Sequence, residues 1–136
     1  MLRDISTALL ATAALSPVSV ADDTAQVGNI IDLQGYQGCL FVPAAGSLAD
    51  VDATFTVLIE EGDASDMSDA AAVADGDLVG TEAAASFVAT DDDTVNQIGY
   101  VGTKRYVRMT ITPAANTAAA LLSGVAILRP EMIGKT

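Results

Sequence analysis

The stretch ATFTVLIEE, residues 53–61, alternates apolar and polar side chains and indicates the fold class. Successive side chains of a strand point to opposite faces of a sheet. One face of this strand would be apolar, with Phe55, Val57 and Ile59. The other would carry Thr54, Thr56 and Glu60, with Leu58 as its apolar exception. This pattern is typical of an antiparallel strand with one face on a core and the other in water.

Residues 106–112, YVRMTIT, repeat the alternation, with Val107, Met109 and Ile111 facing inward. Other β-favouring runs lie at 27–33, 38–42, 86–90, 95–101 and 121–129, between Gly, Pro, Asp and Asn residues. The last run is apolar enough to lie centrally or at an interface. About seven or eight short strands in roughly one hundred residues predict an all-β antiparallel sandwich, of jelly-roll or immunoglobulin-like type, over residues 26–136.

The connections between these runs carry their own signals. We expect the run 38–42 to end at Pro43, because proline cannot donate to a sheet ladder. Residues 60–80 contain the largest share of the Asp and Glu residues, so we expect a solvent-exposed excursion with one or two short strands. Asp91 to Asp93 predict a turn, and Gly102 predicts a tight hairpin between the flanking strands. Residues 113–117 read as a hairpin or loop.

Residues 1–25 predict an N-terminal arm that contacts neighbouring subunits, either as a short helix or in extended form. The arm resembles a secretory signal, but Asp4 offsets Arg3 and Pro17 lies close to the apparent cleavage point. We therefore expect it to stay in the working protein. The contact residues expected in the arm are Ile5, Leu9 and Leu10.

The composition argues against nucleic-acid or membrane binding, catalysis and metal binding. The net charge of −12 disfavours nucleic acid and anionic membranes as partners, and no segment is long and apolar enough to span a bilayer. The chain has no His, and its single Cys39 lies in an apolar run that predicts a buried thiol. We expect no enzyme activity and no cofactor. The acidic runs at 75–77 and 91–93 lack the spacing of a calcium loop, so a solvated turn is favoured over a metal site.

Basic residues are concentrated in the last third of the chain: Lys104, Arg105, Arg108, Arg129 and Lys135. With Tyr106, the first three form the second predicted interface, in which Lys104, Tyr106 and Arg108 project from one strand face toward an acidic neighbour. A solvated strand face is the alternative reading of this row.

Several motifs resemble small proteins encoded among the head genes of tailed bacteriophages, which decorate or cement the capsid. The motifs are MLRDI at 1–5, ALSP at 14–17, DLQGY at 32–36, VLIEEGD at 57–63, DLVG at 77–80 and IGYVGTKRYVR at 98–108. The resemblance implies a virion protein on the exterior of the head, made in the host cytoplasm. Its partners would be the major capsid protein and copies of itself. A trimer is preferred over a pentamer or hexamer.

Two further functions stay open at this point. A vertex turret or a head–tail connection would suit the same motifs. A virion-displayed module that binds carbohydrate or a cell surface would use Tyr36 or Tyr100 as an aromatic platform.

Overall fold

A computed structural model describes residues 4–131, so Arg3 and Lys135 lie outside the described residues. The fold is a sandwich of two antiparallel sheets, as predicted. One sheet has five strands in the order β1-β11-β4-β9-β7. Its strands are β1 (Leu10–Val20), β4 (Tyr36–Leu48), β7 (Leu78–Val79), β9 (Ile98–Tyr100) and β11 (Ala120–Pro130).

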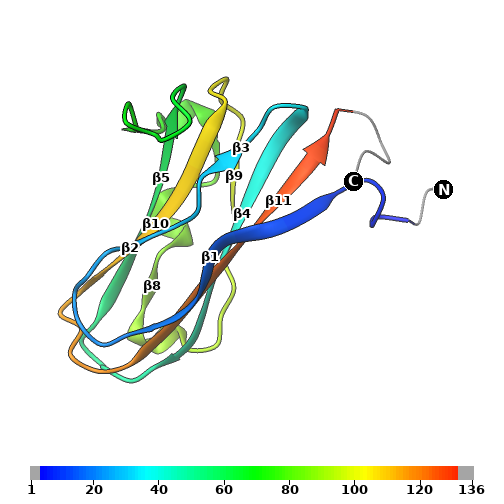
Figure 1. Ribbon diagram of the computed structural model, residues 1–136. Coiled ribbons are helices and arrows are strands. Elements are labelled where there is room, and N and C mark those ends of the chain that lie inside the picture. The colour runs from blue at the N-terminus through cyan, green and yellow to red at the C-terminus, as the bar shows by residue number, and fades with distance from the viewer. Residues whose placement is uncertain (1–3, 132–136) are drawn as a thin grey trace.

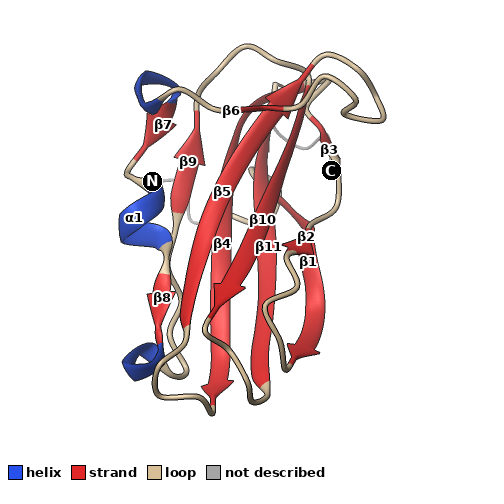
Figure 2. Ribbon diagram, turned by 90° about the vertical axis from the view of Figure 1, so that its left-hand side faces the viewer, coloured by secondary structure: helices blue, strands red, loops and turns tan. Residues whose placement is uncertain are grey.

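The other sheet has six strands, with β10 and β5 at its centre. Its strands are β2 (Gln26–Val27), β3 (Ile31–Asp32), β5 (Thr54–Gly62), β6 (Ala71–Ala72), β8 (Phe87–Val88) and β10 (Tyr106–Ala114). Helical structure is minor: α1 (Glu82–Ala85) and the 3₁₀ turns η1 (Asp75–Asp77) and η2 (Ala89–Asp91). Figure 1 shows the two layers, and Figure 2 shows β5 and β10 in front of β4 and β11.

The core lies between the two sheets. Phe41 of β4, Phe55 of β5 and Met109 of β10 are at most 1% exposed. Gly124 of β11 faces Met109, and a side chain at this position would collide with the methionine methyl group. The sheets therefore approach closely at β11 and β10, and the core is thin there.

The alternation predicted for the two clearest strands is confirmed. Three side chains of β5 (Phe55, Val57, Ile59) and three of β10 (Val107, Met109, Ile111) are buried. The two strands pair over their full length, from Tyr106 opposite Gly62 to Ala114 opposite Thr54. One outward residue, Thr110, is also buried. Its cross-strand neighbours Val27 and Leu58 flank it on both sides.

The predicted boundary at residue 25 is wrong, because β1 is a full strand of the sandwich. Residues from Leu10 to Val20 pair with β11, and Ala14 and Leu15 are buried in the core. The extended alternative is the correct one for this segment. The Ala-rich segment forms a strand because it pairs with β11. An irregularity in the register between Ala13 and Leu15 lets two consecutive residues, Ala14 and Leu15, be buried.

Two other expectations about strands also differ from the structure. The run 27–33 divides into β2 and β3, because the Asn29 N–H donates to the Ala14 carbonyl of the other sheet. Strand β4 continues through Pro43 to Leu48. The Pro43 carbonyl accepts from the Asn96 N–H, so this side of Pro43 faces away from β11 and the missing donor costs no bond to β11.

The predicted hairpin around Gly102 is instead a crossover between the sheets. Strand β9 belongs to the five-stranded sheet and β10 to the six-stranded sheet. The segment 113–117 also connects strands of different sheets, and β10 extends to Ala114. Two short strands, β6 and β7, lie in the acidic excursion, and Asp91 to Asp93 form the predicted turn region.

Candidate functional site

The outer surface of the five-stranded sheet is the most distinctive surface of the domain. Its strands contain no Asp or Glu, and Arg129 is their one charged residue. Strand β11 alternates strictly between buried and accessible positions, so its accessible side chains all point outward. We call the outward side chains of this sheet the apolar face: Ala11, Ala13, Ser19, Leu40, Val42, Ala44, Val79, Leu121, Ser123, Val125, Ile127 and Arg129.

Strand register assembles the apolar face from distant parts of the sequence. One row of paired residues crosses all five strands: Ala11, Ile127, Leu40, Gly99 and Val79. A second row joins Ala13, Val125 and Val42. Leu121 and Val125 are 46% and 41% exposed, which is unusual for large apolar side chains on a central strand. The small Ser123 is the outward residue between them on β11.

Three shallow hollows mark the apolar face. Two lie along the β1–β11 side and share Pro17 and Ser123. The third, of about 460 Å³, lies near the other end, where Leu40, Ile127 and Arg129 meet Ile5 and Leu9. The structure therefore brings two of the predicted arm residues to the border of the apolar face. Leu10 instead points inward and packs against the core.

The outer surface of the six-stranded sheet has the opposite character. Its two central strands present mainly threonines, an arginine and a glutamate outward. The Arg108 guanidinium lies 3.2 Å from the Glu60 carboxylate across the strand pair, and both side chains are about one fifth exposed. This is the ordinary surface of a half-buried antiparallel sheet.

The predicted basic interface is occupied by ion pairs within the chain. Lys104 Nζ lies 2.8 Å from Asp63, and Arg105 makes two hydrogen bonds of 2.9 Å to Asp32. The guanidinium of Arg105 also lies 5.0 Å from the centre of the Tyr106 ring. Hydrogen bonds from Arg105 lower the pKa of the Asp32 carboxyl. These cations balance carboxylates of their own surface, which favours the solvated reading of the row. An intersubunit role for Lys104, Arg105, Tyr106 and Arg108 stays a prediction.

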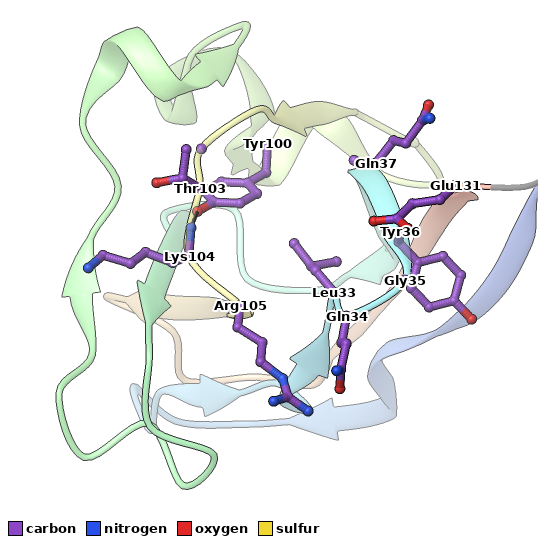
Figure 3. A pocket seen from close by; sticks show the side chains of 12 residues that line it. Leu33, Gln34, Gly35, Tyr36, Gln37, Tyr100, Thr103, Lys104, Arg105 and Glu131 are labelled. Atoms are coloured by element: carbon purple, nitrogen blue, oxygen red, sulfur yellow. Dashed lines mark hydrogen bonds between the residues drawn. The ribbon is translucent and has the colours of Figure 1, made fainter.

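A pocket of about 310 Å³ lies at one end of the sandwich, between residues 33–38 and 102–105 (Figure 3). Lys104 and Arg105 line it but extend away from it (Figure 3). Tyr100 is 1% exposed, and its hydroxyl donates to Glu61 and accepts from the Lys104 N–H. Burial raises the pKa of this phenol, and the hydrogen bond to Glu61 adds to the rise. A side chain held in this way cannot serve as an exposed platform for a sugar.

The acidic side chains of the loops mainly cap backbone groups. Asp92 accepts from the Leu48 N–H, and Asp91 accepts from the Val88 N–H. Asp69 accepts from the N–H groups of Asp63 and Ala64, and these bonds lower the pKa of its carboxyl. Within residues 4–131, no three acidic or thiol side chains come together as metal ligands. The acidic side chains of residues 4–131 therefore stabilise loops through hydrogen bonds to the backbone, in addition to keeping the surface solvated.

Cys39 is buried in the core, as predicted. Burial raises the pKa of its thiol to about 12, so the thiolate is scarce at neutral pH. The residue acts as a small apolar side chain of β4.

Sequence reasoning identified residues 121–129 as central or interfacial but missed most of the apolar face. The sequence predicts Leu40 and Val42 in a short strand that ends at Pro43, leaves Ala44 outside it, and places Ala11 and Ala13 in an arm. One signal was available: all these segments lack carboxylates in a chain with 18 acidic residues.

Among the described residues, no helix has the length and apolar character needed to cross a membrane. Comparison with known proteins adds no relative. No protein-family model matches the chain, and a search of curated proteins finds no match.

Proposed function

We propose that this chain is a structural protein that binds the outside of a tailed-bacteriophage head and stabilises it by adding interface. Two observations support the proposal: the head-protein motifs in the sequence, and an apolar face free of carboxylates on a domain of net charge −12. The second carries more weight. Exposed apolar side chains that form one contiguous patch mark a surface that binds another protein chain, either the major capsid protein or a second copy of this chain, and in both cases they indicate a protein that acts by assembly.

The distribution of charge supports an exterior position. Acidic loops and the polar outer surface of the six-stranded sheet would face solvent, where they keep the particle soluble. Packaged DNA would repel a domain of this charge. The apolar face would be covered, because water contact with Leu121, Val125 and Ile127 costs free energy that burial recovers at about 25 cal/mol per Å².

The N-terminal segment suggests where the domain contacts its surroundings. Ile5 is 69% exposed at the border of the apolar face, although it is a large aliphatic residue. Contact with a neighbouring subunit would bury it. Deletion through residue 20 would remove strand β1 and damage the fold, so the informative truncation ends at residue 8.

The test compares phage heads assembled with the full chain and with the chain lacking residues 1–8. We expect the full chain to co-purify with heads at a fixed copy number relative to the major capsid protein. The truncated chain should keep its β-sheet circular dichroism and show lower occupancy. Absence of the full chain from purified heads would refute the proposal, and unchanged occupancy would remove the N-terminal segment from the mechanism.

The same experiment separates the alternatives. Density from electron cryo-microscopy at the tail-bearing vertex alone would indicate head–tail connection, and density at five-fold positions alone would indicate a turret. The carbohydrate-binding alternative is not favoured, because Tyr100 is buried and hydrogen-bonded within the domain and Tyr36 is partly buried and packs against the core.

A further inference from the structure

We propose that the apolar face is covered by the same face of a second copy of this chain, stacked so that the two β11 strands run in opposite directions. The inference rests on the proposed assembly role and assigns the contact with the head to the N-terminal segment and the other surfaces of the pair, because the apolar face is covered within the pair. Its test concerns the chain alone and needs no capsid. It replaces the trimer preferred from the sequence with a two-fold pair.

The size of the face suits such a pair. The three long strands β1, β11 and β4, spaced about 4.8 Å apart with eleven to thirteen residues each, make a surface of roughly 14 Å by 36 Å, and the short β9 and β7 add a little at one side. The resulting area of about 550 Å² per copy, or about 1,100 Å² for the pair, reaches the total of about 1,000 Å² at which specific interfaces begin. Flat sheet faces that carry small residues stack well at about 10 Å.

Charge also favours a copy of the chain as the partner. Two domains of net charge −12 repel each other on most surfaces. They can approach on this face, because its strands bring no carboxylate into the contact. A buried carboxylate without a partner would oppose association, and none is present on these strands.

Arg129 selects the orientation. It lies at one end of β11, is exposed, and makes no ion pair with any of residues 4–131. At the other end of the face, the exposed Asp93 donates its backbone N–H to the Gly46 carbonyl beside Leu121. A two-fold axis across the strands brings each Arg129 near the partner's Asp93 region. An axis along the strands would bring two arginines together.

The first test measures the mass of the full chain by analytical ultracentrifugation across a concentration series. We expect twice the 13.8 kDa of one chain. Val125→Asp should weaken association by about 100-fold or more, because it puts a charge at the centre of the contact. Val27→Asp is the matched control, since Val27 is 57% exposed on the outer surface of the other sheet. This variant should associate as the unaltered chain does.

Circular dichroism of both variants checks that they fold. Leu121→Thr provides a second variant that removes apolar area but introduces a β-branched side chain, which suits a strand, and it should weaken association by about 10-fold. A chain that remains monomeric at all concentrations would overturn the inference. Association that survives Val125→Asp and Leu121→Thr but fails in Val27→Asp would also overturn it.

Cross-linking tests the orientation. Leu121→Cys and Arg129→Cys proteins are mixed with a short bismaleimide; the native Cys39 is buried and should not react. Opposed strands predict a cross-link in the mixture and little in either protein alone, because Leu121 and Arg129 lie about 27 Å apart along the strand. Efficient cross-linking of either protein with itself would overturn the orientation. Because no capsid is involved, a dimer absent from heads would refute the proposed function and leave this inference intact.

Discussion

The two outer surfaces of the sandwich differ in charge although both sheets share one core. The five-stranded sheet presents aliphatic and small side chains with Arg129 as their single charge, whereas the six-stranded sheet presents threonines and the Arg108–Glu60 pair. Core packing requires only that the inward side chains be apolar. The outward side chains of the first sheet are therefore apolar for a reason other than folding of the single domain, and association is the reason we propose.

Large-to-small changes in the core test what the two sheets have in common. We expect Phe41→Ala in the five-stranded sheet and Phe55→Ala in the six-stranded sheet each to lower the free energy of unfolding by about 3–5 kcal/mol. Both rings are at most 1% exposed in the same core. Urea denaturation measures the loss. A near-neutral result for either variant would mean that the sheets do not depend on a shared core.

The pH dependence of stability tests the difference between the two sides of β4, where Cys39 points into the core and Leu40 lies on the apolar face. Burial raises the pKa of the Cys39 thiol from 9.0 to about 12. Between these values the unfolded thiol ionises and the folded thiol does not, so unfolding releases a proton and stability falls as pH rises. The loss should be on the order of 4 kcal/mol near pH 12.

Denaturation of the unaltered chain and of Cys39→Ala at pH 8, 10 and 11 measures this loss. The raised pKa of Tyr100 contributes a fall in both proteins above its ordinary value of 10.0, and the difference between them isolates the thiol. Parallel pH curves for the two proteins would show that Cys39 is not buried. Alkylation provides a second reading: Cys39 should resist it, whereas Leu40→Cys, on the apolar face, should react in the monomer.

Removal of the Tyr100 hydroxyl tests the end of the sandwich where residues 33–38 and 102–105 line the pocket. Tyr100→Phe leaves the Lys104 N–H and Glu61 without a partner, so we expect a loss of about 1–3 kcal/mol. Tyr106→Phe, on the outer surface of the six-stranded sheet, serves as the control and should change stability by less than about 0.5 kcal/mol. Thermal unfolding measures both. Equal effects would contradict the structural role assigned to the Tyr100 hydroxyl.

The ion pairs of the six-stranded sheet should give the smallest effects. A double-mutant cycle on Arg108 and Glu60, about one fifth exposed, should give a coupling energy of up to about 1 kcal/mol. The cycle on Lys104 and Asp63, about half exposed, should give less. None of these changes should alter the mass of the associated species. Dissociation caused by Arg108→Glu would make the polar surface the interface and reverse the comparison.

Local pattern was enough to predict the sandwich and the inward faces of β5 and β10, because each alternation is read within one segment. The same reasoning failed at β1, where an Ala-rich segment has weak strand propensity and is held by its pairing with β11. It failed at Pro43 because the effect of a missing donor depends on which neighbour the residue faces. It also failed at Gly102, because short-range turn signals do not tell a hairpin from a crossover.

The sequence by itself determined that the protein is acidic, β-rich and has a buried, inert thiol, since composition and period-two alternation follow directly from the residues. Tertiary structure alone decided that Ala11, Ile127, Leu40 and Val79 form one row, and that Lys104, Arg105 and Arg108 are paired within the chain. The physical reason is strand register. Which residues become neighbours across a sheet depends on pairing between segments far apart in the chain, and no single segment carries that information.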